Sequence, residues 1–262
     1  MTIFSQAVQG DPRWEGWKRT VDEGLTKKEW DEYDALIKRE VDSYNNQFRG
    51  KPGYKDVDWL LFKAMLWAES GGPKNPAWKT KALQIGNTGD PGYQTMKYGA
   101  IAYKNPSAPE KQKSEGSELI MSAQLAEDIS TKSINDPNFN IRLGIAYVFT
   151  KMATVKFQQI VDAKDSNTYE HRVAGGETAD AIAKKVGTTL ETLRVMNSSI
   201  DIAKIQPGKT VLKYRKAKID RALVSWAQFT TANLQILYNG NGDKKYAKKL
   251  DYVLELFKNL KR

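Results

Sequence analysis

The segment from Tyr169 to Tyr214 differs from the rest of the chain in its composition and in its pattern of strand and helix signals, and it limits how the chain can fold. It starts with a run that alternates as a strand does, Tyr169 to Val173, and passes through the turn Gly175 to Thr178 into two short helical patterns. A second strand pattern, Lys209 to Lys213, closes it. If these outer strands pair antiparallel, the ends of the segment lie side by side. The segment can then be inserted into a loop of a host domain without disrupting that domain.

Small polar residues and glycines mark the boundaries inside this segment. Gly187 ends the first helical pattern, Thr188-Thr189 start the second, and Asn197 and Pro207-Gly208 precede the closing strand. Together with the Gly-Glu-Thr turn, these landmarks resemble the LysM family, which recognises the N-acetylhexosamine backbone of peptidoglycan or chitin. The resemblance implies a shallow sugar groove, with candidate contacts at Gly176, Glu177, Thr178, Ile205 and Gln206. A pure spacer role is the alternative, and His171 is interpreted as a surface residue of the first strand.

The chain on both sides of the insert is predicted to be mainly helical. Apolar residues recur at spacings of three or four, the period of a helix with one buried face. The pattern predicts helices over residues 30–44, 59–69, 117–129, 141–160, 219–237 and 244–260. Residues 86–116 are rich in Gly, Pro, Asn and Ser, which predicts a loop forming a groove wall. The expected fold class is mainly α, with a helical domain in two parts, 1–165 and 217–262, around an inserted α+β module at 168–214.

Four short motifs follow one another in the helical part: Glu69-Ser70, Ala82 to Gly86, Asn140 to Tyr147 and Leu237 to Gly240. In order and separation they resemble the motif set of soluble lytic transglycosylases and goose-type lysozymes. The resemblance implies a lysozyme-like fold for the helical domain and cleavage of the β-1,4 bond between MurNAc and GlcNAc. Since the inserted segment independently resembles a module that binds the same polymer, peptidoglycan is the expected partner and substrate.

Glu69 is the candidate catalytic residue. It ends the apolar run that starts at Trp59, for which Asp56 is the expected N-cap, and it precedes Gly71-Gly72-Pro73, where a helix cannot continue. Apolar surroundings disfavour an ionised carboxyl and raise its pKa, so a proton is available near neutral pH. The resemblance implies that this one Glu acts first as acid and then as base. The 2-acetamido group of the substrate assists, and the C6 hydroxyl closes a 1,6-anhydro ring without consuming water.

Further residues are expected to bind substrate: Gln84, Asn87, Tyr147, Tyr238 and Asn239. The Gln84 amide can both donate to and accept from acetamido groups. The family places the two tyrosines around the glutamate and the sugar, and Asn239 is expected to hold the turn that presents Tyr238. For each of these residues a core or loop-supporting role is the alternative. Asn140 and Gly144 are interpreted as structural, a helix start and a close-packing position.

The choice between ring closure and hydrolysis depends on a second acid. Gly86-Asn87 stand where goose-type lysozymes have an aspartate, which favours formation of the anhydro product. Asp90 is the nearby acid that could reverse this preference. A hydrolytic muramidase on the same fold is therefore the alternative enzyme. A third possibility is a non-catalytic wall-binding component of a phage tail or secretion apparatus that retains a degenerate active site.

Composition excludes several kinds of chemistry. The chain has no cysteine and a single histidine, so disulfides, thiolate sites and cysteine nucleophiles are excluded, and a Ser-His-Asp triad or a multi-histidine metal site is not expected. No metal or cofactor is predicted. Lys and Arg outnumber Asp and Glu by 41 to 31, a formal charge of +10 that favours a polyanionic partner. No interleaved run of Arg and aromatics forms a nucleic-acid module, so wall surfaces are the expected partner.

The apolar stretches are too short to span a bilayer, so no membrane insertion is expected. Residues 1–10 contain neither a basic leader nor an apolar run. A wall enzyme of this kind is expected to reach the periplasm of a target cell by a specialised secretion system or a phage particle, for instance as an antibacterial effector. Such an effector would have an immunity protein in the producing cell as a further partner.

Overall fold

The computed structural model of the chain describes residues 11–113 and 115–260. The first ten residues, on which the expectation about a leader rests, lie outside the described residues. The chain divides into two compact units: Val155–Leu223 forms one, and the chain up to Thr154 and from Val224 onward forms the other. Within the described ranges, no helix is both long enough and apolar enough to cross a membrane.

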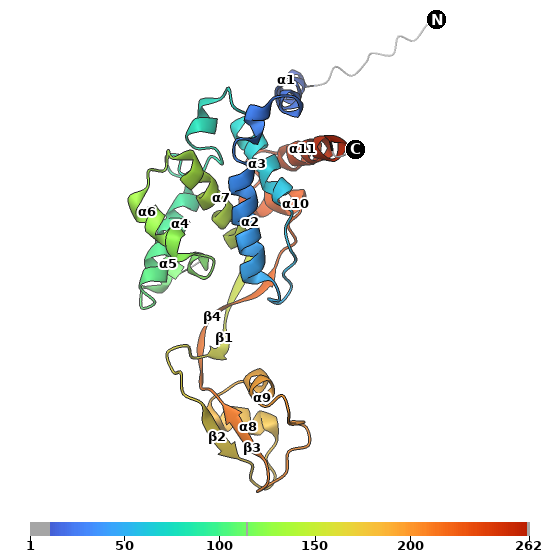
Figure 1. Ribbon diagram of the computed structural model, residues 1–262. Coiled ribbons are helices and arrows are strands. Elements are labelled where there is room, and N and C mark those ends of the chain that lie inside the picture. Colours follow the sequence, from blue (N-terminus) through green and yellow to red (C-terminus); the bar gives the residue numbers. More distant parts are fainter. Residues whose placement is uncertain (1–10, 114, 261–262) are drawn as a thin grey trace, which may run out of the picture. The chain divides into compact units, whose positions relative to one another are not determined.

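The larger unit is built from helices joined by turns and longer loops (Figure 1). Its helices are α1 (Pro12–Asp22), α2 (Asp34–Phe48), α3 (Trp59–Ser70), α4 (Pro91–Lys104), α5 (Glu110–Lys113), α6 (Ala123–Thr131), α7 (Pro137–Met152), α10 (Thr231–Asn233) and α11 (Tyr246–Leu260). Short 3-10 turns lie at Glu23–Leu25, Lys28–Asp31, Pro76–Lys79 and Ser117–Leu119, and a π-helical turn lies at Leu234–Tyr238.

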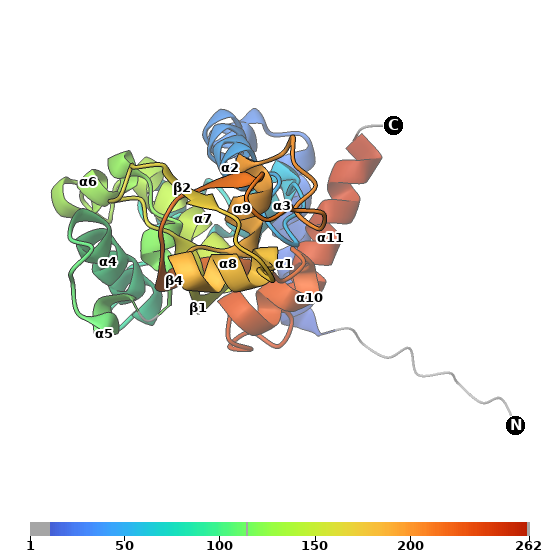
Figure 2. The same ribbon diagram turned by 90° about the horizontal axis from the view of Figure 1, so that it is seen from below.

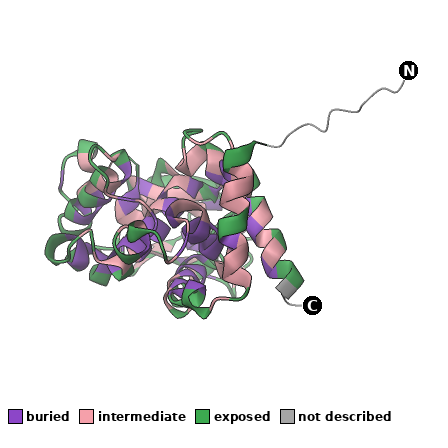
Figure 3. Ribbon diagram, turned by 90° about the horizontal axis from the view of Figure 1, so that it is seen from above, coloured by how far each residue is buried: buried purple, intermediate pink, exposed green. Residues whose placement is uncertain are grey.

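Helices α3 and α7 carry much of the core of this unit, because most of their residues are buried. Figure 3 marks the buried residues of the chain in purple. α3 packs against α2 and α11, and α7 contacts α2, α4 and α6. Aromatic rings fill the centre: Phe62 and Tyr44 both stack on Phe149, with centroids 5.8 and 4.4 Å away. Near the end of α3, Trp67 is 1% exposed and packs edge-on against Trp30. The apolar environment predicted just before Glu69 is therefore present.

Two predictions about this unit are wrong in their details. The N-cap of α3 is Asp58, whose carboxylate accepts a hydrogen bond from the Leu60 N–H at 3.0 Å, whereas Asp56 forms an ion pair with Arg49. Residues 86–116 are not a continuous loop, because they contain α4 and α5. The turn signal at Asp90-Pro91 is in fact a helix start, since Asp90 is the N-cap of α4 and Pro91 occupies its first turn.

The helices predicted over residues 141–160 and 219–237 are wrong in the halves that border the insert. α7 ends at Met152, and the chain continues as strand β1 (Ala153–Val161). The returning chain forms strand β4 (Ala217–Trp226), which pairs with β1 in a two-stranded sheet. The β1 segment is rich in β-branched residues, which suit strands. Each strand is hydrogen-bonded to the other, and the periodicity of one segment alone cannot reveal such a partner.

The inserted module has the predicted order of strand, helix, helix and strand (Figure 1). Figure 2 shows its two helices from below. Its elements are β2 (Tyr169–Arg172), α8 (Ala179–Val186), α9 (Leu190–Met196) and β3 (Val211–Tyr214). β2 and β3 pair antiparallel with Tyr169 opposite Tyr214, so the predicted pairing of the outer strands is confirmed. The module has its own core of Val173, Ile182, Ala183, Leu193 and Leu212. The chain is thus mainly helical, with a small βααβ module.

The predicted landmarks explain how the module is held together. Gly187 ends α8 in the left-handed conformation, with φ +69°, and the Thr189 side chain caps α9. The buried Asn197 amide donates to the carbonyls of Leu193 and Lys213 at 2.8 and 2.7 Å. Its oxygen accepts from the Lys213 N–H at 2.8 Å. Asn197 therefore ties the end of α9 to the closing strand.

Candidate active site and glycan-binding module

Glu69 lies in the last turn of α3, which ends because Gly71 adopts the left-handed conformation, with φ +66°. Its side chain is partly exposed, while the aromatic core packed behind α3 keeps most water away. Burial raises the pKa of the Glu69 carboxyl to about 7, against a weaker opposing effect of Tyr246 and Lys249. Near neutral pH this carboxyl can both give and take a proton, which is the property required of a combined general acid and base.

Three residues in the first turn of α11 and in the turn before it complete the surroundings of Glu69, and none was predicted from the sequence. The Tyr246 hydroxyl is buried and interacts with the Glu69 carboxyl, although the two groups do not reach the geometry of an ordinary hydrogen bond. Lys249 and Asp243 act on Glu69 through their charges, and they form an ion pair with each other at 2.6 Å. Their proximity to Glu69 arises from the packing of α11 against α3, which no local pattern in the sequence marks.

Tyr238 connects Glu69 to the second and third motifs. Its hydroxyl donates to the Leu83 carbonyl at 3.2 Å, and its ring lies 5.8 Å from that of Tyr147 and 6.3 Å from that of Tyr246. Burial and then the nearby Glu69 carboxyl raise the pKa of Tyr238 well above its usual range. The structure therefore brings Glu69 and both predicted tyrosines into one cluster, beside the loop that carries Gln84.

The Gln84 loop is held in an unusual conformation. Gln84 has φ +56°, a left-handed value that costs energy for a residue other than glycine and is often found at functional sites. The Asn140 side chain accepts from the Leu83 N–H at 3.0 Å and donates to the Ile85 carbonyl at 2.8 Å. Asn140 is thus a clamp on this loop and not the start of α7, whose N-cap is Asp136. The exposed Asn87 supports the same loop, because its amide donates to the Gln84 carbonyl at 3.0 Å.

Close packing against α7 also fixes the Gln84 loop. A methyl group added to Gly144 would lie 2.8 Å from the Leu83 Cβ, so only glycine lets α7 approach the residue that precedes Gln84. This agrees with the interpretation of Gly144 as a close-packing position. Gly92 has the same role beside Tyr147, since its added methyl would lie 2.7 Å from the ring.

The two acids near the site have different roles. The Asp90 carboxylate is occupied, because it accepts from the Gly86 N–H at 2.5 Å and from the Gly92 N–H at 2.7 Å. It therefore stabilises the loop and the start of α4. Asp243 is a second acid close to Glu69. Burial opposes its ionisation, but hydrogen bonds from the Lys249 side chain and the Lys245 N–H outweigh burial, and the pKa of Asp243 is lowered.

Asn239 holds the turn between Tyr238 and α11. Its side-chain oxygen accepts from the Asp243 N–H at 2.8 Å, and its carbonyl accepts from the Gly242 N–H at 3.1 Å. Gly240 in the same turn has φ +61°. The side chain of Asn239 thus holds the turn that follows Tyr238, as expected.

In the module, Glu177 stabilises the turn in which it lies. Its carboxylate accepts from His171 at 2.7 Å, from Lys185 at 2.6 Å and from the Ala174 N–H at 2.9 Å. These hydrogen bonds, that of His171 first, lower the pKa of Glu177 to about 2. His171 is therefore more than a surface residue of the strand, since it fixes the carboxylate that shapes the predicted sugar-binding turn.

The other predicted glycan contacts divide into structural and accessible groups. The Thr178 hydroxyl caps α8 by accepting from the Ala181 N–H at 3.2 Å, and Ile205 packs partly against the module core. Gly176 has φ +79° and open space around its Cα, and Gln206 is exposed. The backbone at Gly176 and the side chain of Gln206 are therefore the predicted contacts most accessible to a glycan.

No group of three or more His, Asp or Glu side chains able to hold a metal ion occurs among the residues that the structure describes. Residues 171–212 match the family model of the LysM domain. Comparison with curated proteins finds no match, and comparison with solved structures finds none either. The protein thus has a LysM domain within a mostly helical chain, and this domain indicates peptidoglycan binding and association with the cell wall.

Proposed function

We propose that this protein is a peptidoglycan lytic transglycosylase with a lysozyme-like helical unit. Glu69 is its single general acid and base, and the LysM domain holds the enzyme on the glycan. The main support is the pKa of about 7 of the Glu69 carboxyl, combined with its position among Tyr238, Tyr246 and the Gln84 loop. A carboxyl that is half protonated near neutral pH can donate a proton in the first step of the reaction and accept one in the second.

In the first step, protonated Glu69 donates its proton to the oxygen of the β-1,4 bond between MurNAc and GlcNAc. The carbonyl oxygen of the 2-acetamido group on MurNAc attacks the anomeric carbon as the C–O bond breaks, so the developing positive charge is shared with the substrate's own amide. The GlcNAc-bearing chain leaves with the proton from Glu69. This step needs no second carboxylate on the protein.

In the second step, the Glu69 carboxylate takes the proton of the C6 hydroxyl. The C6 oxygen attacks the anomeric carbon and displaces the acetamido oxygen, which forms the 1,6-anhydro ring and restores protonated Glu69. Lys249 lowers the cost of the charged carboxylate between the two steps, because its ammonium acts on Glu69 through space. We assign the Gln84 amide to an acetamido group and the Tyr147 and Tyr238 phenols to the sugar.

Hydrolysis by the same site is the second candidate function, and Asp243 is the observation in its favour. Asp243 stays charged and lies close enough to Glu69 to raise the pKa of that carboxyl. A charged carboxylate beside an acid could activate water, as the base of an inverting glycosidase does. Its ion pair with Lys249 and its hydrogen bond from the Lys245 N–H compete with that role, so ring closure is the preferred outcome.

Mass spectrometry of purified peptidoglycan digested by the full chain tests the proposal. Fragments ending in 1,6-anhydro-MurNAc are expected. Reducing ends, heavier by one water, would replace the proposal by a muramidase and direct attention to Asp243. Undigested walls that still retain the bound protein would identify a non-catalytic wall-binding protein.

A further inference from the structure

A cavity of about 780 Å³ lies in the helical unit, away from Glu69. It is bounded by the chain that leads into α3, by the segment from Trp226 to Thr230 and by the second half of α11. None of the residues assigned above to the candidate active site lines it. Its volume falls within the range of ligand-binding pockets in proteins.

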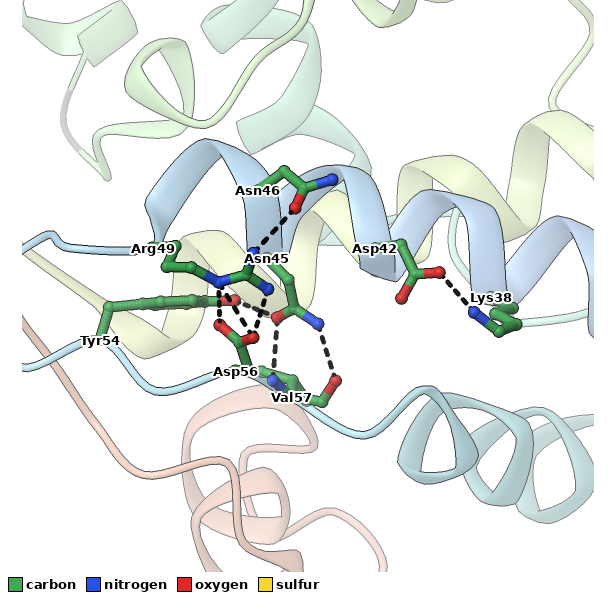
Figure 4. A network of polar contacts seen from close by, with 8 residues as sticks. All are labelled: Lys38, Asp42, Asn45, Asn46, Arg49, Tyr54, Asp56 and Val57. Carbon is green, nitrogen blue, oxygen red and sulfur yellow. Dashed lines mark hydrogen bonds and ion pairs between the residues drawn. The ribbon is translucent and has the colours of Figure 1, made fainter.

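The walls of the cavity are mainly apolar and firmly held. Trp226, Phe229 and Phe257 line it, and the first two rings stack with centroids 6.4 Å apart. Figure 4 shows how the wall before α3 is fixed: the Asn45 amide donates to the Val57 carbonyl at 3.0 Å and accepts from the Val57 N–H at 2.9 Å. Because this wall is preorganised, an apolar side chain could enter it at little cost in ordering.

Acidic residues surround the apolar surface. Asp251 and Glu255 both line the cavity, are exposed and stand four residues apart on α11. Like charges at this spacing disfavour a helix, so the pair costs stability unless a cation lies against it. Asp58 lines the opposite wall. On a chain with a formal charge of +10, this is a local reversal of sign.

The other charged groups at the cavity do not neutralise its acidic residues. Asp56 is paired with Arg49 at 2.5 Å, as Figure 4 shows, and Glu255 with Lys258 at 3.2 Å. The second pair is exposed on both sides and therefore weak. Lys55 is the other base among the lining residues. Asp251 accepts a hydrogen bond from the Thr231 hydroxyl at 2.7 Å, which fixes the position of its carboxylate without neutralising it.

Trp226 adds a hydrogen-bond donor, its indole N–H, to the wall of the cavity. It is 9% exposed, and its indole N–H is buried without an acceptor. Buried donors normally find partners, because an unmade hydrogen bond is costly. A main-chain carbonyl that enters the cavity beside the ring could supply the missing acceptor after a small rotation of the ring. Peptides provide apolar side chains, cations and carbonyls together, whereas the apolar walls offer few partners for the hydroxyls of a saccharide.

We propose that this cavity docks a basic, apolar segment of a partner protein. An aliphatic or aromatic side chain of the partner fills the space between Trp226, Phe229 and Phe257. A neighbouring Lys or Arg lies against Asp251 and Glu255. The proposal does not depend on the activity proposed for Glu69, since the two sites share no residue.

Selection of a random 12-residue peptide library displayed on phage against the full chain tests this proposal. We expect enriched peptides that carry an aromatic or aliphatic residue next to Lys or Arg. Synthetic versions should bind the double variant Asp251→Asn/Glu255→Gln at least about tenfold more weakly, the equivalent of 1.4 kcal/mol. The matched control is Glu29→Gln/Asp42→Asn, which removes one exposed and one half-exposed acid from another part of the same unit and should bind like the wild type.

Both acid substitutions keep the shape of the side chain, and Glu255→Gln should raise the melting temperature slightly by removing the repulsion from Asp251. A folded variant is therefore expected. The proposal is overturned if no peptide is enriched, if enriched peptides lack basic residues, or if their affinity is the same for the acid variant and the control. Binding of peptidoglycan fragments in the cavity, seen as competition with a selected peptide, would also overturn it.

Discussion

Asn140 holds the peptide groups on both sides of Gln84, with its oxygen 3.0 Å from the Leu83 nitrogen and its amide nitrogen 2.8 Å from the Ile85 oxygen. These two hydrogen bonds sustain the left-handed backbone of Gln84, with φ +56°. The hydrogen bonds of a buried amide on α7 therefore offset the conformational strain of a loop that lies more than fifty residues earlier in the chain. The third motif acts on the second through this contact.

Replacement of Asn140 by Asp should weaken both stability and activity. Aspartate can still accept from the Leu83 N–H but cannot donate to the Ile85 carbonyl, so a buried acceptor loses its partner. A loss of about 1–3 kcal/mol is expected. Chemical denaturation and wall-clearing rates measure the two effects. The control is Asn138→Asp, an exposed position on the same helix that should change neither. Equal behaviour of the two variants would contradict the clamp.

The pH dependence of activity should follow the Glu69 carboxyl. Because its pKa is about 7, the proportion of protonated acid falls as the pH rises through 7, and the initial rate of cleavage should fall with it. Rates measured between pH 5 and pH 9 at constant ionic strength check this. A rate that stays constant from pH 5 to pH 9, or one that already falls steeply from pH 5 as an ordinary carboxyl acid would require, would contradict the assignment.

Glu69→Gln should stabilise the fold at alkaline pH. The folded state raises the pKa of this carboxyl from the usual value near 4.3 to about 7, so it binds the proton more tightly than the unfolded chain does. The wild type therefore loses stability as the pH rises between these values. Melting temperatures at pH 5 and pH 8 should show the variant gaining most at pH 8. A larger gain at pH 5 would reverse the sign of the argument.

Tyr246→Phe should raise the pKa of Glu69. The Tyr246 hydroxyl favours the charged carboxylate, so its removal should shift the alkaline limb of the pH–rate profile upward. Tyr252→Phe is the matched control, because the Tyr252 hydroxyl bonds to Asp22 at 2.7 Å and has no link to Glu69. A purely structural role for Tyr246 would lower the rate at every pH and leave the position of the limb unchanged.

Glu177→Gln should destabilise the LysM domain and weaken glycan binding. The folded domain holds the pKa of Glu177 at about 2, so this carboxylate stabilises the fold above the unfolded value near 4.3. The stabilisation is lost as the pH falls from there through 2. The neutral variant should lack this acid dependence, and amide exchange at residues 174–177 of the full chain should become faster. Unchanged exchange and unchanged binding to sacculi would contradict the role given to this cluster.

The LysM domain was predictable from sequence because its landmarks act locally. A glycine that ends α8 and a threonine that caps α9 each need only a few neighbouring residues, so their positions determine the structure. β1 and β4 could not be predicted in the same way. Each strand depends on a partner on the far side of the insert, and an apolar run such as that in β4 fits a helix equally well when read alone.

Only those residues of the candidate site that belong to short sequence motifs could be predicted. Glu69 and Tyr238 belong to short patterns that are visible in the sequence, and the structure places them near each other. Tyr246 was not predicted, because its contact with Glu69 arises from the packing of α11 against α3, which leaves no local mark in the sequence. Asn140 was assigned to a helix start for the same reason, since its partners lie in a distant loop.

The central claim, that Glu69 is the acid and base, is tested most directly by one comparison of wall-clearing rates. Glu69→Gln keeps the size of the side chain and removes the transferable proton, while Glu29→Gln makes the same change at an exposed position of the same unit. The account predicts clearing by the wild type and by Glu29→Gln and a rate for Glu69→Gln at least about 100-fold lower. Equal clearing by all three proteins would contradict it.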